Sequence, residues 1–304
     1  LVFLGVSLSL YATASLLFQG HLWWGQSSWE RWGRSTLIAG IVVNALGILL
    51  HIVFSGQSPL GNMISVISLV VITFLVAGLL LERFTSVRHF NLFVAPTAFL
   101  SLLYPMLMPM RFEDSGSMLV KYPWLGVHVF ITLLGHVGFA LAFCGAGAYL
   151  LQSRSLKRGR LNRFLPALDT SATATFYASA GGFFFFTLGL GMGVLWLFGA
   201  PGEYLGKGDP KIVLALPTWC LFAGYLYLRG VSGRHGSRLT WMVIVAFIIA
   251  VLNYMAVPHR FDESPPEPPV SAKAFPPLRT TWPPVPWCAA RPPPGLPHRI
   301  CPCL

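Results

Sequence analysis

Charged residues are scarce in this sequence, and their scarcity excludes most classes of soluble protein. Asp, Glu, Lys and Arg together make up 10% of the 304 residues, against about 25% in an average soluble domain. Hydrophobic residues make up 55%, and the mean hydropathy is +0.65. So few polar groups cannot cover a water-facing surface, which excludes a soluble enzyme and a nucleic-acid-binding domain. The net charge of +11 fits basic residues in the cytoplasmic loops of a polytopic membrane protein.

Cysteine pairs at the spacing of metal or redox motifs are also missing. No Cys-x-x-Cys occurs among the five cysteines, so the sequence supports neither a thioredoxin-like redox site nor a zinc ribbon. Cys144 and Cys220 lie within apolar runs, where cysteine acts as a small hydrophobic residue.

Long apolar runs are what the sequence has in abundance. A bilayer core of about 30 Å needs about 20 apolar residues in a helix. The runs do not alternate as the strands of a membrane barrel would, so we expect an all-α polytopic membrane bundle of about eight transmembrane helices. The eight segments are 1–18, 36–54, 60–81, 91–108, 124–151, 174–199, 213–229 and 239–257.

Lys and Arg are distributed unequally between the two sets of connections. Twelve of them lie in or next to the connections after the first, third, fifth and seventh spans, and four lie in the other connections. The positive-inside rule then places the first set in the cytoplasm. We expect a multi-pass protein of the bacterial inner membrane, with both termini in the periplasm.

The composition changes beyond Pro258. Residues 264–304 hold 14 of the 24 prolines. Proline cannot continue a helix, and this composition cannot bury a core. We therefore expect a transmembrane bundle at 1–258 and a disordered, proline-rich tail at 259–304, to which we assign no function.

Polar residues near the rim of a membrane bundle are candidates for function. The predicted topology places His51, His128 and His259 together at the external face, at the end of the second span, the start of the fifth and just after the eighth. Imidazole is a common axial ligand of haem iron, and two helices can supply two such ligands. His51 and His128 are therefore candidate ligands of haem iron, and His259 is a further cofactor-binding candidate. For each, a role as an ordinary residue of the membrane surface stays open.

The remaining histidines have simpler interpretations. His136 lies two turns further along the fifth span and suits a hydrogen bond to another helix. His21, His89 and His235 have basic neighbours in predicted connections, and we interpret them as solvated.

The external connection before the seventh span is unusual, because Gly199–Lys211 contains four glycines and two prolines. Asp209 followed by Pro210 suits the N-cap and first position of the next helix. The charged residues of this loop would equally suit salt bridges or anionic groups of a ligand, so Asp209 is also a cofactor-binding candidate.

Several short blocks of this sequence match a family pattern. The pattern has an external loop ending in W-x-W-D-P-K-E, then a helix reading roughly T-W-x-x-Y-x-x-Y-L-H-x-R, and further upstream a histidine-bearing helix. The matching residues are Val127-His128-Val129, Tyr149-Leu150, Leu165–Asp169, Asp209-Pro210-Lys211, Thr218-Trp219, Tyr225-Leu226, Arg229 and Tyr254. Together they resemble the cytochrome c assembly family of CcsA, CcmC and HemX-like haem-handling membrane proteins. The resemblance covers about 36–257, and the eight-span layout best suits the HemX-like branch.

The resemblance implies a membrane protein of cytochrome c assembly. Such a protein binds or delivers haem at the external face for c-type cytochrome maturation, and it is an assembly factor and not an enzyme. Its implied partners are haem, the other maturation components and the lipid bilayer. Gly206 and Gly208 stand where the family has tryptophans, which removes flat rings on which a porphyrin can stack. Two alternatives therefore stay open: a regulatory or scaffolding HemX-type protein that has lost haem binding, and a secondary transporter, which would show internal repeats and broken helices.

Overall fold

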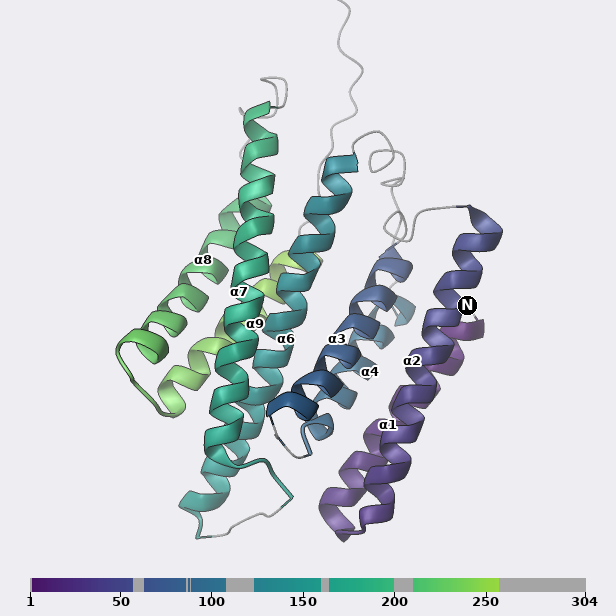
Figure 1. The fold of residues 1–304 in the computed structure, drawn as a ribbon, viewed down its shortest axis with the longest axis vertical. Coiled ribbons are helices and arrows are strands. Elements are labelled where there is room, and N and C mark those ends of the chain that lie inside the picture. The colour runs from purple at the N-terminus through teal and green to yellow at the C-terminus, as the bar shows by residue number, and fades with distance from the viewer. Residues whose placement is uncertain are drawn as a thin grey trace, which may run out of the picture. The chain divides into compact units, whose positions relative to one another are not determined.

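The structure is a bundle of long helices. The computed structural model describes residues 2–56, 63–85, 87, 89–107, 123–159, 164–199 and 210–256. Within these ranges the secondary structure is entirely helical, with eight α-helices and one short π-helix after α8 (Figure 1), which confirms the predicted all-α bundle. The elements are α1 (Val2–Trp24), α2 (Ser27–Ser55), α3 (Met63–Thr85), α4 (Asn91–Leu107), α6 (Pro123–Lys157), α7 (Leu168–Gly199), α8 (Pro210–Leu226), the π-helix Tyr227–Val231 and α9 (Ser237–Ala256).

Six of these helices are long and apolar enough to cross a membrane, so the chain is a multi-pass membrane protein. They are α1, α2, α3, α6, α7 and α9. The helix α4 is also apolar but has 17 residues, which at 1.5 Å per residue gives about 26 Å.

Several helices extend beyond the apolar runs that predicted them. The helix α2 begins at Ser27 and not near residue 36, and α6 continues to Lys157, past residue 151. Hydropathy marks only the part of a helix in the hydrocarbon core, whereas backbone hydrogen bonding continues through polar residues at the rim. Gly25, with a φ of 67°, provides the left-handed conformation at which the chain turns from α1 into α2.

The helices pack in two groups of four. In the first group α1 contacts α2 and α4, and α3 contacts α2 and α4. In the second, α6 contacts α7 and α9, and α8 contacts α7 and α9. The groups meet where α3 and α4 pack against α6, and α3 also reaches α7. Consecutive helices run in opposite directions (Figure 1), so α2, α4, α7 and α9 end at the bundle end where α1, α3, α6 and α8 begin.

The pairing of α1 with α2 rests on glycines that recur every seventh residue. A Cβ added at any of these glycines would press on the side chain of an aromatic residue of α1. The pairs are Gly33 with Phe18, Gly40 with Tyr11 and Gly47 with Phe3. The opposite face of α2 exposes aliphatic side chains suited to lipid, namely Ile38, Val42, Leu46, Leu49 and Val53. Small residues of this kind let membrane helices approach closely.

The pairing of α6 with α7 brings the two backbones even closer. A Cβ at Gly135 would lie 2.8 Å from the backbone nitrogen of Phe186, and one at Gly182 would lie 2.9 Å from the carbonyl oxygen of Gly135. Backbone atoms cannot move aside as a flexible side chain can. This seam between α6 and α7 positions the histidine described next.

Candidate functional site

His128 lies near the start of α6 and faces α7. Its Nδ1 is 2.8 Å from the carbonyl oxygen of Gly189, and a Cβ added at Gly193 would lie 3.0 Å from its Cε1 atom. The glycines of α7 thus leave room for the imidazole, and one of them provides its hydrogen-bond acceptor. The ring is half-buried.

This hydrogen bond determines which nitrogen of His128 carries the proton. A carbonyl oxygen can only accept, so Nδ1 must be the protonated donor, and the lone pair lies on Nε2. Histidines that bind metals commonly hold their second nitrogen in this way, because the bond orients the ring and makes the ligating nitrogen more basic. The donor chemistry of His128 therefore fits one axial ligand of a haem iron.

His51 lies near the end of α2, four residues before Ser55, in the first group of helices. Its Nε2 is buried and makes no hydrogen bond within the described residues. The end of α2 and the start of α6 lie at the same end of the bundle (Figure 1). We name it the His128 end. The helix α3 contacts both α2 and α6, so the two histidines are carried by different neighbours of one helix.

The other two predicted site residues, Asp209 and His259, lie outside the described residues. Their proposed roles therefore rest on the sequence.

His136 packs among the aromatic rings of its own helix and of two others. Its Nδ1 is 2.9 Å from the carbonyl oxygen of Thr132, one turn earlier in α6. Its ring centroid is 5.6 Å from that of Phe186 on α7 and 5.8 Å from that of Tyr254 on α9. This hydrogen bond joins His136 to its own helix, and the bond to another helix that the sequence suggested stays a prediction.

The sequence blocks that match the family pattern lie in the packing of the second group. Trp219 on α8 donates from Nε1 to the Thr187 hydroxyl on α7 at 3.0 Å. Phe222 is fully buried and stacks on Phe139 of α6, with ring centroids 3.7 Å apart. Tyr225 is buried as well. The family pattern on α8 therefore corresponds to contacts that hold α6, α7 and α8 together.

The interpretation of His21 as a solvated residue is wrong. His21 is only 6% exposed and lies beside Glu30 and His89, with its ring centroid 5.1 Å from that of His89. The sequence could not show this, because the two histidines meet only when the α1–α2 turn folds against the connection between α3 and α4. His235, by contrast, is exposed as expected.

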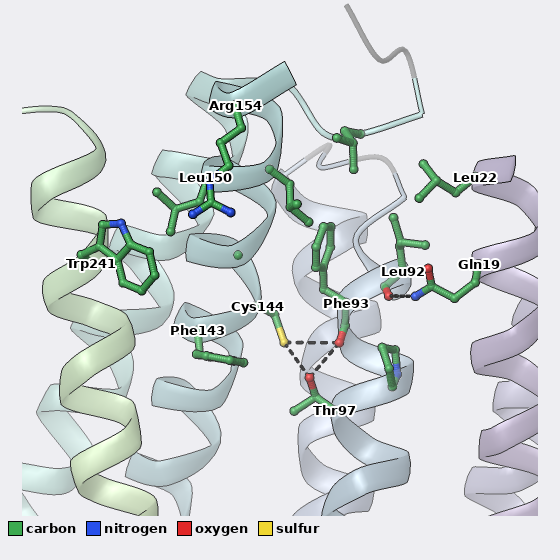
Figure 2. Close-up of a pocket in the computed structure, with 14 residues that line it drawn as sticks. Gln19, Leu22, Leu92, Phe93, Thr97, Phe143, Cys144, Leu150, Arg154 and Trp241 are labelled. Carbon is green, nitrogen blue, oxygen red and sulfur yellow. Dashed lines mark hydrogen bonds between the residues drawn. The ribbon is translucent and has the colours of Figure 1, made fainter. Parts of the chain in front are cut away.

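A cavity of about 370 Å³ opens between the two groups of helices (Figure 2). It is lined by residues of α1, α4, α6 and α9 and by Leu165 of the α6–α7 connection. Its volume is within the usual range for small-molecule pockets. Arg154, one of its lining residues, is 26 residues after His128 on α6, or about 39 Å along the helix. The cavity is therefore at the bundle end opposite His128.

The walls of this cavity are mostly apolar, and several of their polar groups bond to one another. The Thr97 hydroxyl donates to the carbonyl oxygen of Phe93 at 2.8 Å, and Cys144 Sγ lies 3.5 Å from the Thr97 oxygen. Gln19 Nε2 donates to the carbonyl oxygen of Leu92 at 3.3 Å, and Figure 2 shows these pairs in the wall. With the Arg154 cation among its lining residues, the cavity suits an apolar chain that carries an anionic group.

Comparisons with known proteins agree with the sequence blocks. A family model described as cytochrome C assembly protein matches residues 60–260. The cytochrome c biogenesis protein CcsA of Guillardia theta is 24% identical over 244 residues, which cover 73% of this chain and 80% of that protein. CcsA of Mesostigma viride is 25% identical over 229 residues, 67% of this chain and 75% of that protein. CcsA of Prochlorococcus marinus (strain NATL2A) is 23% identical over 234 residues, which cover 67% of this chain and 74% of that protein. No solved structure gives a significant match.

Proposed function

This chain belongs to the cytochrome c assembly protein family, and we propose that it holds haem at the His128 end of the bundle as a membrane-embedded assembly factor. In this proposal the protein positions its ligand and does not itself form covalent bonds. Its partners would be haem and the other components of c-type cytochrome maturation. The positive-inside distribution of Lys and Arg supports placing the His128 end in the periplasm, with the protein in a bacterial inner membrane.

The observation that carries the proposal is the hydrogen bond from His128 Nδ1 to the carbonyl of Gly189. It leaves the Nε2 lone pair as the ligating position and orients the ring from a second helix. Haem would supply an iron centre with axial positions that accept imidazole nitrogen. The chain's own part is to hold the imidazole in place.

We propose His51 as the second ligand, because α2 carries it to the same end and its Nε2 is buried with no hydrogen bond to the described part of the chain. A haem bound by both residues would lie between the two groups of helices. His259 is the alternative second ligand, and Asp209 would cap α8 and contribute to the external loop.

Among the branches of the family, the named relatives favour a CcsA-like role in cytochrome c biogenesis. The HemX-like branch, which the eight-span layout suggested, gains no specific support from them. A regulatory or scaffolding protein without haem remains the second candidate, because Gly206 and Gly208 replace the tryptophans of the family pattern.

The absorbance spectrum of the purified full chain separates these candidates. The haem proposal predicts a Soret band from protein made in haem-sufficient cells. Replacement of His128 by Ala should reduce the haem retained per chain by at least tenfold, because it removes an iron ligand. His136→Gln is the matched control, since His136 lies on the same helix with its Nδ1 bonded to the backbone of that helix.

A wild-type protein that shows no Soret band would support the regulatory candidate and overturn haem binding. If wild type is pigmented but His128→Ala is pigmented equally, haem binding stands and the assignment of His128 is wrong.

A further inference from the structure

Three residues outside the proposed haem site gather at the opposite end of the bundle. His21 lies in the last turn of α1, Glu30 in the first turn of α2, and His89 in the short connection before α4. One ligand atom from each lies within 4.8 Å of the other two. The cluster joins the turn between α1 and α2 to the connection between α3 and α4.

The distances within the cluster are close to those of a metal site. His89 Nδ1 lies 3.1 Å from Glu30 Oε1, and His21 Nε2 lies 3.8 Å from Glu30 Oε2. Tetrahedral ligands that are each about 2.1 Å from a zinc ion lie about 3.4 Å from one another. The three atoms lie within 4.8 Å of one another, so side-chain rotations, including that of the 36% exposed Glu30, would be needed to reach that spacing.

The orientation of His21 is the strongest indication of a ligand. Its Nδ1 lies 2.8 Å from the carbonyl oxygen of Gln26, so Nδ1 is the donor and Nε2 carries the lone pair. The His21 side chain is 8% exposed, and its Nε2 is buried with no hydrogen-bond partner among the residues that the structure describes. A buried polar atom without a partner is costly, and a metal ion in the cluster would satisfy it.

The surroundings of His21 hold it in this orientation. The Gln26 side chain accepts a hydrogen bond from Trp29 Nε1 at 2.7 Å, which braces the turn that provides the carbonyl. The ring of Phe164, from the connection between α6 and α7, meets the His21 ring edge to face at 5.2 Å. Backbone carbonyls and packed rings that fix a ligating imidazole are typical of metal sites.

An ion pair accounts for only part of the cluster, because His89 Nδ1 and Glu30 Oε1 form a hydrogen-bonded pair at 3.1 Å that does not include His21. The nearby guanidinium of Arg34 is directed at Glu82, at 2.6 Å, and not at Glu30. Even in a protonated His21, the Nε2 nitrogen lies 3.8 Å from Glu30 Oε2, and this N···O distance is too long for a hydrogen bond.

We propose that His21, Glu30 and His89 bind a divalent transition metal ion of the zinc type. Two imidazoles and one carboxylate suit zinc and its neighbours in the first transition row. Magnesium and calcium prefer sites made of oxygen ligands alone. The metal would connect the turn between α1 and α2 to the start of α4. Binding of this metal would not depend on haem.

The test is a zinc titration of the full chain in detergent, after removal of metal with a chelator and with a chromogenic competitor present. Wild type should bind one zinc ion per chain. Glu30→Gln and His89→Asn should each weaken binding by at least tenfold. Asn is chosen at residue 89 because His89 has a φ of 61°, which Asn tolerates better than most residues. His235→Asn, at an exposed histidine of the α8–α9 connection, is the matched control and should bind as wild type does.

Equal zinc affinity in wild type, Glu30→Gln and His89→Asn would overturn the proposal, as would displacement of zinc by an equal concentration of magnesium. Cobalt-substituted wild type provides a measurement that needs no variant. The proposal predicts the strong visible bands of a four- or five-coordinate ion, and the weak spectrum of hydrated cobalt would contradict it. Neither result depends on haem, so failure here leaves the proposed function untouched.

Discussion

Several histidines bond through a ring nitrogen to a backbone carbonyl oxygen, and they differ in which segment of the chain provides that carbonyl. The carbonyl that holds His136 is in its own helix, and the one that holds His235 is two residues away. The carbonyl that holds His128 belongs to a different helix, so the orientation of its ring depends on how α6 and α7 pack. A substitution in α7 that moves this ring should therefore change the affinity of any ligand bound by His128.

Two glycines of α7 allow a test of this dependence. A Cβ at Gly193 would lie 3.0 Å from the His128 ring, whereas a Cβ at Gly191 has nothing within 4 Å. Gly193→Ala should displace the imidazole by a few tenths of an ångström and weaken haem retention by about tenfold, the effect of losing a supporting contact of a metal ligand. Haem content and Soret position of the purified variants measure this.

Gly191→Ala should match wild type in both measurements, since both variants carry the same loss of a glycine in one helix. Equal spectra for the two variants would show that haem binding does not depend on how α7 packs against the His128 ring. The hydrogen bond from His128 to Gly189 would then not affect haem retention.

At the scale of helices, α6 and α7 approach each other closely along their seam of glycines. A Cβ at Gly182 would lie 2.8 Å from the Phe139 ring and 2.9 Å from two backbone atoms of α6. We expect Gly182→Ala to force the helices apart and to lower the free energy of unfolding by about 1–3 kcal/mol, as overpacking does elsewhere. Thermal or denaturant unfolding in a fixed detergent measures it.

The neighbouring Gly181 is the control, because a Cβ there meets nothing within 4 Å. Gly181→Ala should leave stability unchanged or raise it slightly, since alanine favours helix over glycine. A Gly181→Ala variant as unstable as Gly182→Ala would indicate that glycine flexibility, and not close packing, matters at this point of α7.

Hydropathy predicted the helices well but their contacts poorly. The eight apolar runs all became helices, because a chain in hydrocarbon must satisfy its backbone internally. Hydropathy does not predict which face of α2 packs against α1. Leu37 is buried and Ile38 is exposed, although both are aliphatic, because lipid and protein interior are equally apolar. The seven-residue spacing of Gly33, Gly40 and Gly47 is the sequence signal that indicates the face of α2 in contact with α1.

For the candidate haem site, the sequence predicts position through topology alone. Alternating spans bring the end of the second and the start of the fifth to one face, as they do in the structure, and haem ligation by His51 and His128 stays a prediction. His21 and His89 were misjudged, because their meeting depends on a two-residue turn and on the tertiary contact of two connections. Neither is visible as a pattern in the sequence.

At the scale of the whole molecule, orientation in the membrane is the property on which the proposed function depends. We expect an added cysteine at Glu203 to react with an impermeant thiol reagent from outside, and one at Arg158 to be protected, in a chain whose five natural cysteines are replaced. The physical reason is the excess of Lys and Arg in the connections on the Arg158 side. Labelling of intact cells or spheroplasts measures it.

Lysis provides the control, since both cysteines should react once the membrane is open. The reverse pattern in intact cells would place His128 at the cytoplasmic face and remove the periplasmic haem site.

The order of contacts between the helices also has a consequence for synthesis of the chain. Each helix packs on the one just before it wherever both are described, as α1 does with α2 through a two-residue turn. Such neighbours can pair as soon as both have left the ribosome. The contacts of α1 with α4 and of α6 with α9 close longer loops, which cost more entropy, and they must wait for later segments. The cavity needs all four of these helices, so it is completed only when α9 arrives, and an unfinished chain has no such compartment to fill.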